Sequence, residues 1–114
     1  MSVKITTINP TTEEILAEYD AITPEQVNHE VHDSRKIFDT IWKKFDISER
    51  AKLLRNLSYV LIQKKKEYAT IITNEMGKPI TQSLSEVEKC AWVCEYYAEN
   101  AERILAQEKI ETNA

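Results

Sequence analysis

Residues 74–98, NEMGKPITQSLSEVEKCAWVCEYYA, decide how the rest of the chain is arranged. They contain the only glycine of the chain, Gly77, and Pro79 follows two residues later. Glycine favours the end of a helix and proline favours its first turn, so we expect one helix to end and another to begin here. The sequence therefore predicts a corner between two helices, with the preceding elements packed back against it.

The helix that begins after Pro79 is expected to be buried on several sides. Apolar or small residues recur in it at alternating steps of four and three, and aromatic residues lie beside this seam. Small residues predict that another backbone approaches closely, and a helix that is apolar on several faces is buried on several faces. The seam consists of Ile80, Leu84, Val87, Ala91, Cys94, Ala98, Ala101 and Leu105, and the flanking apolar residues are Trp92, Val93, Tyr96, Tyr97 and Ile104.

A β-hairpin is predicted before the helices. Residues 3–8, VKITTI, and residues 14–19, EILAEY, are typical of strands, and Asn9-Pro10 begins the turn between them. Two strands alone are marginally stable in water, so the hairpin requires a neighbour.

Two more helices are predicted between the hairpin and the corner. Thr23-Pro24 with Gln26 indicates a helix that reaches about residue 43, and Asp46 with Glu49 indicates another that lasts to about residue 74. The predicted fold is mostly α, with a β-hairpin segment at 1–22, a three-helix segment at 23–106 and a frayed tail at 107–114.

Composition excludes several classes of protein. The net charge of −4, with acidic and basic residues interleaved, gives no basic patch for nucleic acid. No apolar run approaches the length of a membrane span or a signal-peptide core. A single glycine argues against a phosphate-binding nucleotide loop. Two cysteines four residues apart do not form a secreted disulfide framework, so we expect a cytoplasmic protein.

Few side chains indicate chemistry by themselves. His29 and His32 are interpreted as surface residues, because a metal site needs three or four convergent ligands. Cys90 and Cys94 are interpreted as buried or half-buried structural thiols. Glu75 lies in the last turn of its helix, where the carbonyl ends disfavour a carboxylate. Either solvent tolerates this carboxylate, or a cation or basic side chain is its partner.

Several short motifs occur in a fixed order along the chain. Around the corner they are Glu75-Met76-Gly77-Lys78-Pro79, Glu86-Val87 and Tyr97-Ala98, and upstream they are Asn9-Pro10, Trp42 and Glu49-Arg50-Ala51 with Leu54. Together they resemble the N-terminal region of NAD(P)-dependent aldehyde dehydrogenases, over nearly the whole chain. Residues 86–102, EVEKCAWVCEYYAENAE, resemble the succinate-semialdehyde dehydrogenase branch. The first turn departs from the family, which usually has glycine where this chain has Glu13.

The resemblance implies the start of an α/β fold that stops before its nucleotide-binding sheet. It implies an enzyme that oxidises an aldehyde, in that branch succinate semialdehyde, to the acid with NAD or NADP. In the family a cysteine thiolate attacks the carbonyl, an asparagine side chain and a backbone amide hold the oxyanion, and a glutamate activates water. These groups follow the region that this chain resembles. The resemblance therefore implies no catalytic residue and no bound cofactor here, and a chain that is inactive alone.

The resemblance also implies two minor sites. Glu75 stands where the family places an acidic residue at a structural cation site, which main-chain oxygens of Thr7 and Ile8 would complete. The residues that match the helix face at the mouth of the family's substrate tunnel are Glu86, Lys89 and Val93.

Without the nucleotide-binding sheet, the aromatic residues of the last helix would form an exposed apolar patch. We therefore expect the remainder of the enzyme chain as the natural partner, and self-association through residues 79–105 in its absence. The alternative is a free-standing helical interaction module that pairs through the same helix.

Overall fold

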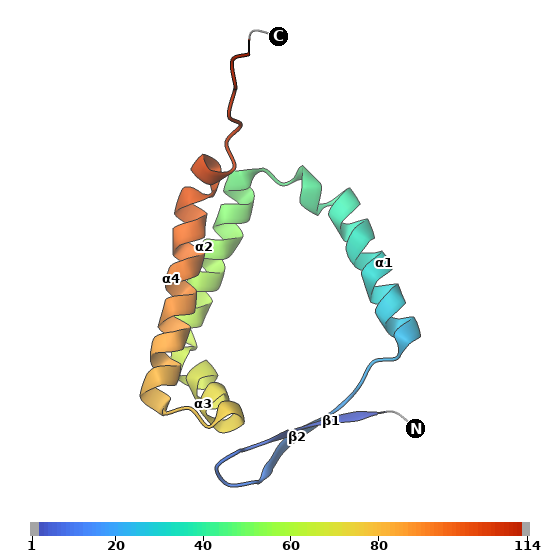
Figure 1. Ribbon diagram of the computed structural model, residues 1–114, viewed down its shortest axis with the longest axis vertical. Helices are drawn as coiled ribbons and strands as arrows, with labels where there is room; N and C mark the ends of the chain where they lie inside the picture. Colours follow the sequence, from blue (N-terminus) through green and yellow to red (C-terminus); the bar gives the residue numbers. More distant parts are fainter. Residues whose placement is uncertain (1–2, 113–114) are drawn as a thin grey trace.

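The computed structural model describes residues 3–112 and shows a mostly helical chain behind an N-terminal hairpin (Figure 1). The strands and helices are β1 (Lys4–Ile8), β2 (Ile15–Asp20), α1 (Pro24–Thr40), the short 3₁₀ helix η1 (Trp42–Lys44), α2 (Ile47–Gln63), α3 (Lys65–Met76) and α4 (Ile80–Ile104).

The hairpin pairs β1 and β2 in antiparallel register, with an irregularity between Thr7 and Ile8. Its loop is organised by Asn9, whose side-chain oxygen accepts a hydrogen bond from the Thr11 amide at 2.9 Å, as the turn chemistry predicts. Glu13 has a φ of 62°, in the left-handed region. The aldehyde dehydrogenase resemblance expects glycine at this position. The backbone of Glu13 therefore has the conformation that glycine favours, although the residue is glutamate.

Glu13→Gly is expected to raise the free energy of unfolding by about 1 kcal/mol, because glycine has no Cβ to disfavour a positive φ. Urea unfolding followed by circular dichroism measures the change. The matched control is Glu14→Gly, next to the start of β2, which should lower stability. There glycine adds freedom to the unfolded chain and also removes the hydrogen bond that the Glu14 carboxylate accepts from the Thr12 hydroxyl at 3.1 Å. Equal effects of the two substitutions would contradict this explanation.

Both predicted capping boxes are present at the starts of α1 and α2. The Thr23 hydroxyl accepts a hydrogen bond from the Gln26 amide at 3.2 Å, and the Gln26 side chain accepts one from the Thr23 amide at 2.7 Å. Asp46 and Glu49 repeat the pattern, with the Glu49 amide donating to Asp46 Oδ1 at 2.8 Å. Each box pairs two amides that the helix itself leaves without partners.

The Asp46 cap makes stability depend on pH. The hydrogen bond from the Glu49 amide, followed by that from the Ser48 hydroxyl, lowers the pKa of Asp46 below its ordinary value of 3.8. Because the pKa is lower in the folded state, the contribution is fully present above the unfolded pKa and is lost as the pH falls through the folded pKa.

Asp46→Asn keeps a good capping side chain but removes this titration. We expect the variant to match the native chain at neutral pH and to lose less stability below about pH 4. Thermal unfolding across this pH range measures the effect. Parallel acid profiles for the two chains would show that the Asp46 carboxylate is not responsible.

The structure corrects the predicted number of helices from three to four. The helix expected from Asp46 to about residue 74 is interrupted at Lys64, where φ is −100° and ψ is 16°. The break lets α2 run along α4 while α3 turns to pack against both α4 and β1. No proline or glycine marks Lys64. The apolar stripe is interrupted there by the polar residues 63–67, QKKKE, but Leu61 and Tyr68 on either side are seven residues apart and keep one helical phase, which favours a continuous helix.

The closest packing joins α2 to α4 through small side chains. Ala51 and Ser58 of α2 are buried, as are Ala91 and Ala98 of α4. Arg55 of α2 donates through Nη2 to the carbonyl oxygen of Ala98 at 3.4 Å. The predicted close approach of another backbone to α4 is therefore confirmed, and α2 supplies that backbone.

The corner between α3 and α4 has the predicted geometry. Gly77 ends α3 with a φ of 67°, and its amide donates to the Thr73 carbonyl at 2.9 Å. Behind it the Thr73 and Ser83 hydroxyls are hydrogen-bonded at 2.9 Å, and Ser83 is completely buried. A Cβ at Gly77 would lie 3.0 Å from the Pro10 ring, so the corner also holds the hairpin loop.

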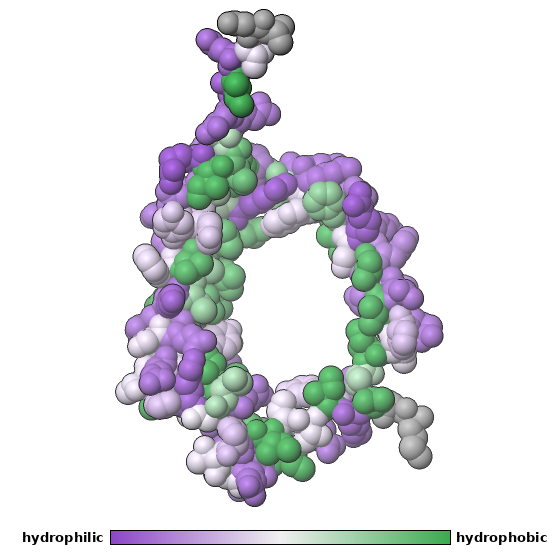
Figure 2. Space-filling view, viewed as in Figure 1, coloured by the Kyte–Doolittle hydropathy of each residue, from purple (hydrophilic) through white to green (hydrophobic). Residues whose placement is uncertain are grey.

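The described chain is open. Its radius of gyration is 20.0 Å, whereas a compact chain of this length would have about 13 Å. The hairpin, α1 and the α2–α4 pair surround an opening (Figures 1 and 2), and apolar side chains of α1 and α2 border it. No residue of α1 is buried. The chain thus presents apolar surface that residues 3–112 do not cover. Within these residues, no helix has the length and hydropathy that a membrane crossing requires.

Candidate functional site

The main candidate site is a groove of about 900 Å³ along one face of α4. Glu86, Lys89 and Val93, which the resemblance associates with a tunnel mouth, all line it. The structure thus brings the three residues together on one surface, while their role in admitting a substrate stays a prediction. The other lining residues are Lys78, Thr81, Gln82, Ser85, Cys90 and Cys94.

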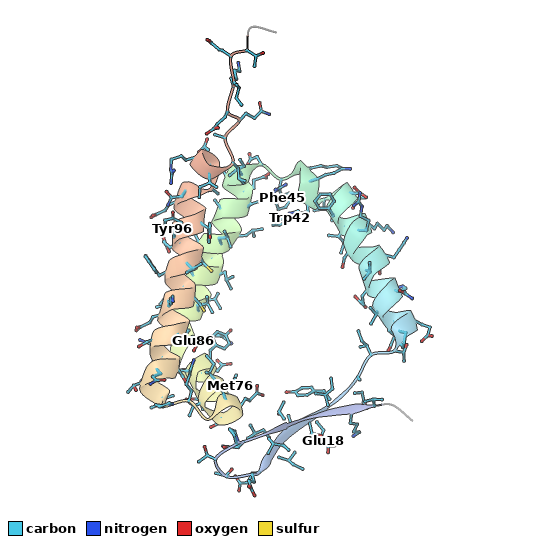
Figure 3. All side chains as sticks on the ribbon, viewed as in Figure 1. Glu18, Trp42, Phe45, Met76, Glu86 and Tyr96 are labelled. Atoms are coloured by element: carbon cyan, nitrogen blue, oxygen red, sulfur yellow. The ribbon has the colours of Figure 1, made fainter. Side chains whose placement is uncertain are left out.

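An ion pair between Lys78 and Glu86 crosses one end of the groove. Lys78 comes from the loop before α4 and Glu86 from the second turn of that helix, so the pair joins the corner to the groove. Glu86 is labelled in Figure 3. Sequence reasoning missed the contribution of Lys78. The spacing of four between Gln82, Glu86 and Cys90 would have indicated a shared helix face.

The two thiols of the groove differ in exposure. Cys94 is half-buried, as predicted, whereas Cys90 is exposed, so the prediction of a buried or half-buried thiol is wrong for Cys90. Ala91, the next residue along α4, is buried, whereas Cys90 lies about 100° away around the helix and lines the groove. Both thiols are free.

The candidate cation site lies where α3 and β1 are neighbours. Glu75, in the last turn of α3, is exposed. Thr7 and Ile8 flank the register irregularity of the hairpin, and Thr7 Oγ1 is buried with no hydrogen-bond partner in the described chain. A buried oxygen of this kind fits an oxygen-coordinated cation, while the assignment of Glu75 to that cation stays a prediction.

The histidines of α1 lie on the surface, as predicted. The side chains of His29 and His32 are 72% and 79% exposed, and each has its Nδ1 within 3.6 Å of an Asp33 carboxylate oxygen. Residues 3–112 contain no group of three or more histidine, cysteine, aspartate or glutamate side chains that could hold a metal ion.

Two local features concern the backbone groups that bind phosphates in other proteins. Gly77 is packed against the ring of Pro10. At the starts of α1 and α2, the amides of Gln26 and Glu49 are hydrogen-bonded to the capping side chains of Thr23 and Asp46. Asp46 would also repel a phosphate. The starts of α3 and α4 have no side-chain cap.

The fold and these sites define a helical segment whose apolar faces are left exposed by residues 3–112. The chain matches the aldehyde dehydrogenase family over residues 1–114 and belongs to that family. It corresponds to the N-terminal region of the family. Its hairpin and helices are therefore the beginning of the family's α/β fold.

Individual relatives agree with this assignment. The chain is 36% identical over 110 residues, 96% of its length, to a probable NADP(+) succinate-semialdehyde dehydrogenase of Synechocystis, and covers 24% of that protein. It is 38% identical over 96 residues, 84% of its length, to the mitochondrial succinate-semialdehyde dehydrogenase of Arabidopsis thaliana, and covers 18% of it. The solved succinic semialdehyde dehydrogenase of Streptococcus pyogenes, in complex with NADP+, superimposes with a TM-score of 0.88 at 31% identity, over 95% of this chain and 24% of that one. The chain therefore spans a quarter or less of the relatives it matches.

Proposed function

We propose that this chain is the N-terminal part of an NAD(P)-dependent aldehyde dehydrogenase that oxidises succinate semialdehyde, or an aldehyde of the same class, to the carboxylic acid. Family membership over residues 1–114 is the observation that carries the proposal. In such an enzyme the chain supplies framework and not reacting groups. The apolar faces of α1, α2 and α4 cover a nucleotide-binding sheet that the remaining polypeptide provides.

The groove on α4 forms part of the substrate entrance, with Glu86, Lys89 and Val93 in its wall. The charged residues that line it are Lys78, Lys89 and Glu86, two cations and one anion. This excess of positive charge supports an aldehyde that carries a carboxylate, as succinate semialdehyde does, because complementary charge raises the local substrate concentration.

Lys89→Glu, made in the complete enzyme, is therefore expected to raise KM for a carboxylate-bearing semialdehyde about fivefold, with kcat unchanged. The matched substrate is a neutral aldehyde of similar length, for which KM should not move. Steady-state kinetics with both aldehydes measures the effect. An equal rise in KM for the two substrates would remove Lys89 from substrate selection.

A structural cation at Glu75 and the main-chain oxygens of Thr7 and Ile8 is a second part of the proposal. The supporting observations are the neighbouring positions of α3 and β1 and the unpartnered Thr7 hydroxyl. The cation would tie the end of α3 to the hairpin and offset the unfavourable charge of Glu75 at a helix C-terminus.

NAD or NADP would act in the full-length enzyme, where it accepts the hydride, and none is expected to bind this chain alone. The packing of Gly77 against Pro10 supports that division. The partner of the chain is the rest of the enzyme. In its absence the chain self-associates through residues 79–105. We place the protein in the cytoplasm, where Cys90 and Cys94 stay reduced.

A chimera tests the proposed function. This chain replaces the matching region of the Synechocystis relative, and formation of NADPH is followed with succinate semialdehyde. We expect the chimera to turn over within about tenfold of the relative, since the exchanged region carries framework only. The chain alone should give no turnover. A folded chimera without activity, or turnover by the chain alone, would refute the proposal.

A further inference from the structure

We propose that Cys90 and Cys94 form a two-thiolate site for Cu(I) in the groove of α4. Both thiols line this groove, one exposed and one half-buried, so an ion from solvent reaches them. They lie four residues apart on a helix that is continuous from Ile80 to Ile104, which places them one turn apart on the same face. The inference does not depend on the proposed function.

The helix geometry favours chelation over a disulfide. Side chains four residues apart on a helix have Cβ atoms about 5–6 Å apart. A disulfide requires about 3.8 Å between Cβ atoms, so Cys90 and Cys94 would have to distort α4 to form one. A metal ion lies between its two sulfur atoms and bridges a wider gap, which the undistorted helix provides.

The positive charge in the groove favours the negatively charged complex that Cu(I) forms with the two thiolates. Two thiols and one Cu(I) give a bis-thiolate complex with a net charge of −1, and two protons are released to solvent without any change of oxidation state. Lys89 lines the same groove and offsets this negative charge, whereas the charge of Lys78 is paired with Glu86. Because the thiols must lose protons, affinity rises with pH.

Cu(I) suits the pair better than zinc does. Soft thiolates select Cu(I), for which two sulfur ligands suffice, whereas zinc is held by four ligands in most structural sites. Glu86, one turn before Cys90, is the nearest further ligand type on this face. It is already paired with Lys78.

The test is an anaerobic titration of the 114-residue chain with Cu(I) in competition with the chromophoric chelator bathocuproine disulfonate. We expect one Cu(I) per chain. Cys90→Ser and Cys94→Ser should each lower the affinity at least about 100-fold, since losing a ligand costs more than losing a residue that only orients one.

A matched variant tests the spacing. The double substitution Cys94→Ser with Glu95→Cys keeps two thiols but turns the second one about 100° around the helix, away from the groove. It should bind as weakly as the single variants, with its helix content unchanged by circular dichroism. Failure of the native chain to take up Cu(I), tight binding by the spacing variant, or one ion shared between two chains would each overturn the proposal.

Discussion

The isolated chain is expected to form dimers or larger species at micromolar concentrations, and a polar substitution on the outer face of α4 should separate them. Trp92 is 66% exposed, and the rings of Tyr96 and Tyr97 lie 5.4 Å apart beside it without entering a core. Tyr96 is seen on α4 in Figure 3. Contiguous apolar surface of this kind is rare on soluble monomers, and aromatic residues contribute most when such surfaces associate.

Trp92→Glu should raise the dissociation constant of the self-associated chain at least about 30-fold, which corresponds to the loss of about 2 kcal/mol from one aromatic anchor. Glutamate is a good helix former, so α4 should remain intact. Sedimentation velocity over a concentration series measures the change.

Gln82→Glu is the matched control, because it adds the same charge to α4 on the groove face rather than among the aromatic residues. It should leave the dissociation constant within about threefold of the native value. A native chain that stays monomeric at every concentration would contradict self-association. Equal dissociation constants for the two variants would show that the self-association surface does not include Trp92.

The second large effect concerns the seam between α2 and α4. Ala98→Leu should lower the free energy of unfolding by about 1–3 kcal/mol, because three extra carbon atoms must enter a contact between backbones. Ala98 is 5% exposed, and its carbonyl accepts the hydrogen bond from Arg55 of α2, so any displacement of the helices also weakens that bond.

Glu99→Leu is the control for Ala98→Leu. Glu99 is the next residue along α4 and is exposed, so the same side chain there should change stability by no more than about 0.5 kcal/mol. Urea unfolding of both variants, followed by circular dichroism, gives the comparison. If Ala98→Leu were as well tolerated as Glu99→Leu, the two backbones would not be in close contact.

Local features of this fold could be predicted from the sequence, because they depend on neighbouring residues. The capping boxes at Thr23 and Asp46, the turn at Asn9-Pro10 and the helix end at Gly77 each follow from one or two side chains and the backbone groups beside them. The small residues of the α4 seam likewise predicted the close approach of another backbone, which α2 supplies in the structure.

The remaining features depend on contacts that no local pattern encodes. At the bend at Lys64, α3 turns to pack against α4 and β1. Leu61 and Tyr68, on either side of the polar residues 63–67, keep one helical phase, so the local pattern favours a straight helix. Cys90 is exposed because its face of α4 lacks cover in residues 3–112. At the candidate site the family resemblance indicated Glu86, Lys89 and Val93 as one helix face, but the participation of Lys78 required the folded corner.

The central claim is that the apolar faces bordering the opening are built to be covered by the rest of an aldehyde dehydrogenase. Hydroxyl-radical footprinting of the isolated chain and of the Synechocystis chimera tests it most directly. Val31 and Phe38 of α1, with Leu57 of α2, are exposed here and should react in the isolated chain and become protected in the chimera, while His29 and His32 react in both. Equal reactivity of Val31, Phe38 and Leu57 in the two proteins would contradict the claim.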